Sequence, residues 1–228
     1  KKTIKKMFYW LENFIIEENK FSFFNDTAYG ISSNFEDLNK YSNLLKLGNN
    51  TNLNIKENYC NFLKNSAFIN SKIDDGRIII DLGGFGYKKN PGHSHADCLS
   101  FEFSLFKSKL IVNSGISTYN NDTLRLFQRS TISHNALFFD NLNSSDVWRS
   151  FRVGKIAKTK IKNIKFDKDN SVLNILADHN GFFNKKNNRI HSRKFNLKKN
   201  SLILIDHISG DYKGAKVNFF FHPDVQFI

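Results

Sequence analysis

Residues 92–120 read GHSHADCLSFEFSLFKSKLIVNSGISTYN and decide how the rest of the chain is interpreted. Within this stretch, residues 99–105 (LSFEFSL) alternate apolar and polar side chains, which is the two-residue period of a β-strand with one buried face. A second apolar run follows at Leu110–Asn113 and ends in a polar turn. The stretch therefore predicts neighbouring strands with polar side chains at their ends.

More short strands are predicted on both sides of this stretch, separated by turns at regular spacing. They are Arg77–Leu82, Ala136–Asp140, Phe151–Thr159, Val172–Ala177, Ile190–Leu197, Leu202–His207 and Val217–His222. The residues between Leu197 and Leu202 have the length of a hairpin turn. Because no strand–helix alternation supports a parallel sheet, the pattern predicts a mainly β chain with an antiparallel β-sandwich.

Residues 1–57 are predicted to be helical rather than β. Ile4, Phe8, Leu11 and Ile15 form an apolar stripe at helical spacing. A second helix is predicted from Phe35 to Leu47, with an asparagine N-cap before it and a glycine after it, and residues 21–31 (FSFFNDTAYGI) between the helices as an ordered loop. Two helices cannot form a domain alone. We therefore expect a helical segment over 1–66, the end of a larger upstream helical domain, followed by the sandwich over 67–228.

Composition excludes several classes of protein. The 228 residues include 24 Phe and are 40% hydrophobic, which is enough for a packed core, and no apolar run is long enough to span a membrane. Cys60 and Cys98 form neither a disulfide framework nor a cysteine-rich zinc motif. The net charge of +13 fits an acidic polysaccharide, a nucleic acid, or a compositional bias without a partner. Because the lysines of 155–168 and 185–199 are dispersed and no arginine-rich helix occurs, nucleic acid is the weakest option.

The densest polar cluster is His93-Ser94-His95-Ala96-Asp97. On extended backbone its two histidines point to the same side about 7 Å apart, which suits two metal ligands, or one ligand beside a substrate-facing imidazole, or two surface histidines without a role. The turn at Asn113 and the segment 129–135 (RSTISHN) also join strands to loops. We expect the three segments to meet at one rim of the sandwich, where loops carry the chemistry.

These blocks resemble a known family. GHSHADCLSFEFSLFKSKLIVNSGISTYN, followed by QRSTISHNALFFD at 128–140, is similar to the C-terminal sheet domain of the heparinase II/III-like polysaccharide lyases, and FFNDTAYGI at 23–31 resembles the end of their helical toroid. The resemblance covers the chain from about Met7 onward. It implies a super-sandwich fold and a carbon–oxygen lyase that cleaves uronate-containing glycans, glycosaminoglycan or alginate-like, by β-elimination. It also implies a bacterial periplasm or cell envelope and an upstream helical domain that supplies the general base.

The resemblance also implies roles for single residues. It implies a zinc site made by His95, Asn113 and His134. Asn113 stands where the family has an aspartate, and an uncharged amide should hold the ion less tightly. The side chains expected at the substrate cleft, as catalytic or supporting groups, are His93, Tyr119, Arg129 and Asn135. Asp97 is expected either to orient a histidine or to cap a turn.

Two other functions stay open at this point. The amide at 113 favours a non-catalytic domain that binds glycan or acts as a scaffold in an envelope-polysaccharide pathway. A metallohydrolase with an HxH motif is the other, but such enzymes generally use a parallel barrel, which the strand pattern does not supply.

Overall fold

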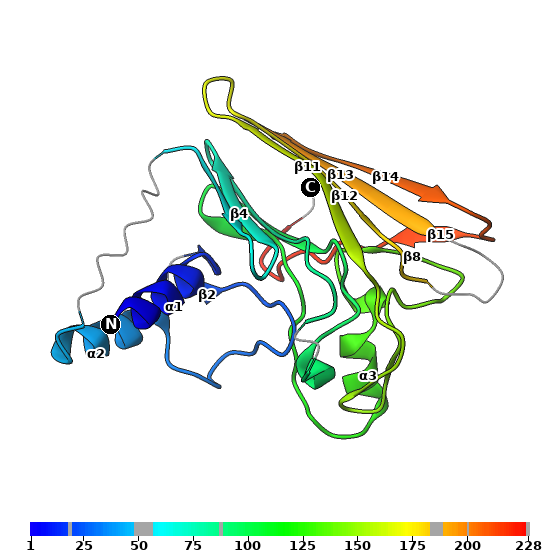
Figure 1. The fold of residues 1–228 in the computed structure, drawn as a ribbon, viewed down its shortest axis with the longest axis horizontal. Coiled ribbons are helices and arrows are strands. Elements are labelled where there is room, and N and C mark those ends of the chain that lie inside the picture. Colours follow the sequence, from blue (N-terminus) through cyan, green and yellow to red (C-terminus); the bar gives the residue numbers. More distant parts are fainter. Residues whose placement is uncertain (18–19, 48–56, 87–88, 183–188, 200, 227–228) are drawn as a thin grey trace.

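Two antiparallel sheets lie face to face in the computed structural model, which describes residues 1–17, 20–47, 57–86, 89–182, 189–199 and 201–226 (Figure 1). The five-stranded sheet has the order β3 (Tyr59–Leu63), β4 (Phe68–Ile73), β5 (Gly76–Asp81), β6 (Phe101–Leu105), β7 (Ser108–Ile111). The four-stranded sheet has the order β11 (Thr159–Asp167), β12 (Val172–His179), β13 (Ile190–Lys198), β14 (Ser201–Ser209). The chain is thus mainly β and forms an antiparallel sandwich, as the alternation of residues 99–105 predicts.

The main core fills the space between the two sheets. Alternate residues of β12 and β13 point inward, among them Leu173, Ile175 and Phe195, and they meet residues such as Ile78 and Phe101 from the other sheet. Burying one such side chain stabilises a fold by roughly 1.5–3 kcal/mol, so this layer is the main source of stability.

The N-terminal segment covers the outer face of the five-stranded sheet. Phe14, Ile16 and Phe24 pack there against Phe68 and Ile79. Strand β5 is therefore buried on both faces, which explains its unbroken apolar sequence. The elements of this segment are α1 (Lys2–Glu12), the short pair β1 (Ile15–Glu17) and β2 (Lys20–Phe21), and α2 (Phe35–Leu44).

The predicted helices are present, with shorter bounds. Ile15 was placed on the first helical stripe but lies in β1, because the helix ends at Glu12. The second helix begins as predicted, with the Asn34 side chain accepting a hydrogen bond from the Asp37 N–H, but it ends at Leu44 rather than Leu47. The predicted stop at Gly48 falls outside the described residues.

Several strands were missed or misplaced by the sequence pattern. Strand β3 lies before the expected start of the sandwich at 67, and β4 begins just after it, but neither strand was predicted. Whether a domain boundary lies there stays a prediction. Strand β11 was expected at Phe151–Thr159, where only Arg152–Val153 (β10) pairs, with Val147–Trp148 (β9). A bulge between Ile161 and Asn163 shifts the alternation of β11 and hides it from a two-residue pattern. The predicted hairpin is confirmed, since Lys198 pairs with Ser201.

Short elements at one end of the sandwich hold the polar segments together. They are a 3₁₀ turn at Pro91–His93, α3 (Thr123–Arg129), a second 3₁₀ turn at Thr131–Ser133, and β8 (Leu137–Phe139), which pairs with β15 (Ala215–Val217). No helix in the described part of the chain is long and apolar enough to cross a membrane.

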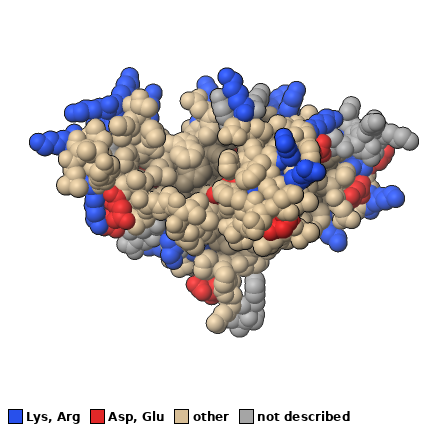
Figure 2. Space-filling view, turned by 90° about the horizontal axis from the view of Figure 1, so that it is seen from below, with Lys and Arg blue, Asp and Glu red and all other residues tan. Residues whose placement is uncertain are grey.

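Basic side chains do not gather in one stripe. On the face seen in Figure 2, Lys and Arg are scattered along the margin and mixed with Asp and Glu, while the hollowed middle is mostly uncharged. A continuous basic track, which nucleic-acid binding favours, is not seen on this face.

Candidate functional site

The carboxylate of Asp26 lies at the centre of the polar cluster. Its Oδ1 is 2.8 Å from His95 Nε2, and its Oδ2 is 2.8 Å from His93 Nδ1. The guanidinium of Arg125, from α3, donates to both oxygens at 2.5 and 2.8 Å. Burial alone would raise the pKa of Asp26, but the hydrogen bonds from His95, Arg125 and His93 outweigh burial and hold the pKa at about 2. Asp26 is therefore ionised and joins the loop before α2 to two segments of the sandwich.

The three side chains predicted to meet do lie together. His95 Nδ1 is 3.3 Å from His134 Nε2, and His134 Nδ1 is 3.2 Å from Asn113 Oδ1. All three residues are at most 1% exposed. With Asp26, they form a buried row in the order carboxylate, imidazole, imidazole, carboxamide.

The protons of this row can be assigned from its chemistry. Burial lowers the pKa of His134 well below its usual value, with the neighbouring His95 adding to the effect, and burial also lowers the pKa of His95 against the opposing effect of Asp26. Both rings are therefore neutral, and His95 donates its Nε2 proton to Asp26. With Asn113 Oδ1 accepting from His134 Nδ1, the two facing nitrogens would both carry lone pairs. If the Asn113 amide is rotated so that its Oδ1 and Nδ2 exchange places, Nδ2, which has no partner among the described residues, donates to His134 Nδ1. His134 then carries its proton on Nε2 and donates it to His95 Nδ1, which completes a relay of hydrogen bonds.

The predicted zinc site is met only in part by these donors. Two nitrogens bound to one tetrahedral zinc lie about 3.3–3.4 Å apart, so the facing nitrogens of His95 and His134 have suitable spacing. Asn113, however, contacts the opposite nitrogen of the His134 ring and does not point to the same place. Within the described ranges, no group of three or more His, Cys, Asp or Glu side chains could hold a metal ion. The described residues thus supply two donors where protein zinc sites usually have three or four. Zinc stays a prediction.

An aromatic surface covers the Asp26–Arg125 pair. The rings of His93, Tyr119 and Phe151 contact one another at centroid distances of 5.4–5.9 Å, and the Arg125 guanidinium lies 5.1 and 5.3 Å from the Tyr119 and Phe151 ring centres. The His93 side chain is 55% exposed, and Tyr119 and Phe151 are 47% and 42% exposed. This surface is where a ligand would first meet the cluster.

The backbone at His93 differs from the prediction. We expected His93 and His95 on one extended strand, but His93 ends a 3₁₀ turn. The two rings still share one carboxylate because each binds a different oxygen of Asp26.

Two of the residues predicted for the cleft are buried positioning residues in this structure. Arg129 is 0% exposed and donates to the backbone carbonyls of Ser94, Arg149, Ser150 and Arg152. Asn135 is also buried; its Nδ2 donates to the carbonyls of Phe101 and Val112, and its Oδ1 accepts from the Phe220 N–H. Both side chains form hydrogen bonds to backbone groups of separate segments and so hold these segments together beneath the exposed surface.

Asp97 does not bond to a histidine in the described structure. It is buried beside Asp81, and burial raises its pKa to about 7, with the Asp81 carboxyl close by. The prediction that it orients an imidazole is therefore not met.

Sequence reasoning missed Asp26, Arg125 and Phe151. Asp26 stands in FFNDTAYGI, which is interpreted from sequence as an ordered loop resembling the end of the toroid, with no role given to its aspartate. A lone acid among aromatic residues was the available signal of a buried charge with a partner. Arg125 lies on a helix of seven residues that has no clear apolar period. Phe151 was predicted only as the first residue of a strand, with no role at the site.

Gly115 holds the Asp26 loop close to the sandwich and provides a test of this contact. Its φ is +58°, and a Cβ there would lie 2.1 Å from the Thr27 carbonyl oxygen, which accepts a hydrogen bond from the Ile116 N–H. We expect Gly115→Ala to lower the free energy of unfolding by about 1–3 kcal/mol, measured by urea denaturation.

Gly30→Ala is the matched control for this change. Gly30 also has a positive φ, +76°, but nothing lies within 4 Å of an added Cβ, so only the backbone penalty remains, about 1 kcal/mol. Equal losses in the two variants would contradict the close contact between Gly115 and Thr27.

The comparisons with known proteins agree with the observed fold. The family model for heparinase II/III-like C-terminal domains matches residues 59–227. The crystal structure of the heparan sulfate lyase HepC from Pedobacter heparinus has a TM-score of 0.71 and 16% identity, and the match covers 98% of this chain and 35% of that chain. A heparinase III structure has a TM-score of 0.66 and 15% identity, with 97% of this chain and 36% of that chain covered.

These likenesses have a limited extent. At such identities the structural matches show the fold, and the chain spans about a third of the length of the structures it matches. No curated protein sequence matches the chain significantly.

Proposed function

This chain belongs to the heparinase II/III-like family, in its C-terminal domain, and we propose that it is the β-sandwich part of a polysaccharide lyase that cleaves uronate-containing acidic glycans by β-elimination. The observation that carries the proposal is the Asp26 carboxylate, which binds two imidazoles under an exposed aromatic surface. The similar HepC structure is named a heparan sulfate lyase, which makes heparan sulfate the first substrate to test.

The reaction requires that a weakly acidic proton leave carbon 5 of the uronate while the glycosidic oxygen leaves carbon 4. A positioned acid or base contributes typically 10²–10⁴-fold to such a step. His93 is the described residue best placed for this work, because Asp26 binds its Nδ1 and its ring is more than half exposed. The carboxylate fixes the tautomer with the proton on Nδ1, which leaves Nε2 as the nitrogen that faces a substrate.

The flanking rings would bind the sugar rather than react with it. Tyr119 and Phe151 present apolar ring faces beside His93, and such faces pack against the C–H groups of sugars. Arg125 is bonded to Asp26 and is not free to neutralise a substrate carboxylate. That neutralising group and the principal base are expected from the upstream helical domain.

A pair of histidine variants tests the proposal in the full-length protein that contains this chain. We expect His93→Ala to lower kcat/KM on heparan sulfate by at least 100-fold, followed by the ultraviolet absorbance of the unsaturated product. His207→Ala is the control, because His207 is an exposed histidine on β14. Equal activity in the two variants, with both proteins folded, would remove His93 from the reaction.

A second function is supported by Asn113. Because an amide replaces the aspartate that the family resemblance leads us to expect, the domain could bind acidic glycan without cleaving it, as a scaffold in an envelope-polysaccharide pathway. Saturable binding of heparan sulfate without any unsaturated product, zinc being supplied, would favour this alternative. A zinc ion held by His95, His134 and ligands outside the described residues, and a periplasmic or envelope location, remain parts of the proposal.

A further inference from the structure

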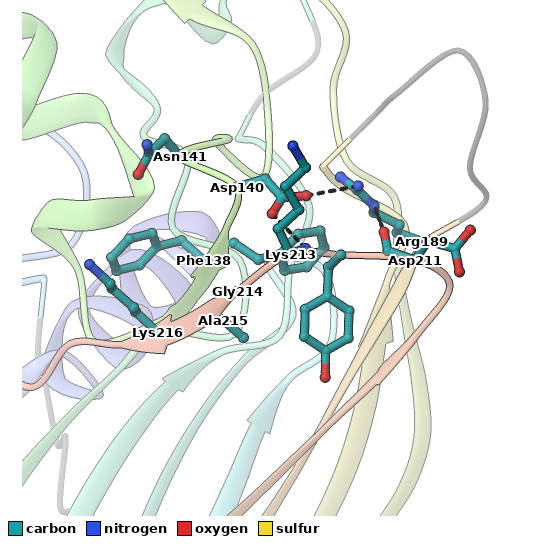
Figure 3. Close-up of a pocket in the computed structure, with 11 residues that line it drawn as sticks. Phe138, Asp140, Asn141, Arg189, Asp211, Lys213, Gly214, Ala215 and Lys216 are labelled. Carbon is teal, nitrogen blue, oxygen red and sulfur yellow. Dashed lines mark hydrogen bonds and ion pairs between the residues drawn. The ribbon is translucent and has the colours of Figure 1, made fainter.

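A cavity elsewhere on the chain shares no residue with the Asp26 cluster. It has a volume of about 790 Å³ and lies beside the paired strands β8 and β15, with Arg189, directly before β13, in its lining (Figure 3). This volume is within the 300–1,000 Å³ range of small-molecule sites. Phe139 and the half-exposed Tyr212 contribute aromatic rings to the lining, with ring centres 5.8 Å apart.

A buried arginine forms the wall of this cavity. The Arg189 side chain is 5% exposed and lies 5.0 Å from the centre of the Phe139 ring. Its Nε donates to the Asp211 carbonyl at 2.6 Å, and its Nη2 donates to Asp140 at 2.9 Å. The Nη1 has no hydrogen-bond partner in the described part of the chain. A buried guanidinium with an unused donor is costly to leave unpaired and is well suited to an anionic oxygen.

The charges around the cavity leave a positive excess. Both oxygens of the Asp140 carboxylate already have partners: one accepts from Arg189 and the other from the Lys213 N–H. Backbone hydrogen bonds lower the pKa of Asp140, so the carboxylate is ionised. The Asp211 carboxylate points away from the Asp140–Arg189 pair (Figure 3). Lys213 and Lys216 line the cavity, and neither ammonium group forms an ion pair with a described residue. Two lysines that form no ion pair within the described part of the chain, and one buried guanidinium, thus line this cavity.

We infer that this cavity binds the anionic group, carboxylate or sulfate, of an acidic sugar unit at a second site separate from the Asp26 cluster. Lys213 and Lys216 attract the anion, the unused Nη1 group of Arg189 donates to it, and the Tyr212 ring packs against the sugar. The choice of a sugar rests on the proposed function, whereas binding of an anion as such does not.

Charge reversal at the two lysines tests the inference. Lys213 and Lys216 are exposed, so the K213E/K216E variant should fold. Using the full-length protein, we expect binding of a sulfated heparan sulfate hexasaccharide to this cavity, resolved from binding at the Asp26 cluster, to be at least tenfold weaker in the variant than in the wild type, by isothermal titration calorimetry at physiological salt. An unsulfated glucuronate-containing hexasaccharide is the second arm. A loss only in the sulfated arm identifies sulfate as the bound group, and a loss in both arms identifies the carboxylate.

The K194E/K198E variant is the matched control, because these two lysines are exposed on β13 and lie outside the cavity. An equal loss of affinity in the control would mean that only the overall charge matters, and it would overturn the site. Unchanged affinity in K213E/K216E would also overturn it. Since only binding is measured, a protein without lyase activity would refute the proposed reaction and leave this site standing.

Discussion

Replacing Asp26 by Leu should lower the free energy of unfolding by about 3–5 kcal/mol, because it removes the carboxylate that pairs with Arg125 in the described part of the chain. The Arg125 side chain is 0% exposed, so its charge would stay buried without a partner. The same change removes the acceptor of both His93 and His95, and we expect any lyase activity of the full-length protein to fall with it. Denaturant unfolding at pH 7 measures the first effect, and kcat/KM on heparan sulfate measures the second.

A double variant separates the ion pair from the rest of the site. In D26L/R125M both charges are replaced by apolar groups, and most of the lost stability should return, whereas activity should not. The exposed Asp169 gives the surface control, since Asp169→Leu should change stability by less than about 0.5 kcal/mol. If Asp26→Leu costs no more than Asp169→Leu, the buried ion pair does not exist as described.

Lowering the pH should also weaken the Asp26–Arg125 ion pair and reduce the free energy of unfolding. The pKa of Asp26 is about 2 in the folded protein, against an ordinary value of 3.8, so its contribution is present above about pH 4 and is lost as the pH falls towards 2. The difference corresponds to roughly 2 kcal/mol. The Asp26→Leu variant should lack this part of the acid-induced loss.

The sandwich could be predicted because its strands keep a two-residue period. Residues 99–105 and the β13–β14 hairpin show that period without interruption, and both are where the sequence places them. Strand β11 was misplaced because one bulge moves its apolar side chains out of phase, and β4 is buried on both faces and does not alternate. Period-based reading therefore fails where a strand is bulged, and it can fail where a strand is covered on two sides, as in β4. Strand β6 is also buried on both faces but keeps its alternation, because serine and glutamate side chains occupy its second face.

The sequence predicted the residues of the candidate site that lie at strand ends, but not the distant residue that joins them. The segments with His95, Asn113 and His134 were each marked by polar residues at strand ends, and they do converge. Asp26 comes from 69 residues before His95, in a loop whose own sequence predicts no partner. The sequence also does not predict the orientation of the His134 ring, which depends on packing. This orientation places His95 at Nε2 of the ring and Asn113 at the opposite nitrogen, Nδ1.

A second buried ion pair connects the four-stranded sheet to this site. Arg193, fully buried in β13, donates to Asp206 of β14 through Nε and Nη2. Its Nη1 donates to the carbonyls of Leu99 and Asn135, which follow His95 and His134 along the chain. Asp206 also accepts a hydrogen bond from His191 at 2.6 Å. Arg193 is thus a positioning residue that acts on the site through two backbone carbonyls.

Replacing Arg193 by Met should therefore have an effect as large as the loss of Asp26. We expect the free energy of unfolding to fall by about 3–5 kcal/mol, because the buried Asp206 would lose its charged partner. In the intact protein, the hydrogen bonds from His191 and Arg193 outweigh burial and lower the pKa of Asp206, so the carboxylate is charged. Arg152→Met, at an exposed arginine, is the control and should change stability by less than about 0.5 kcal/mol. The double variant R193M/D206L should recover most of the stability but leave the Leu99 and Asn135 carbonyls without their donor. A double variant that is stable and retains full kcat/KM would show that Arg193 stabilises the sandwich without positioning the site.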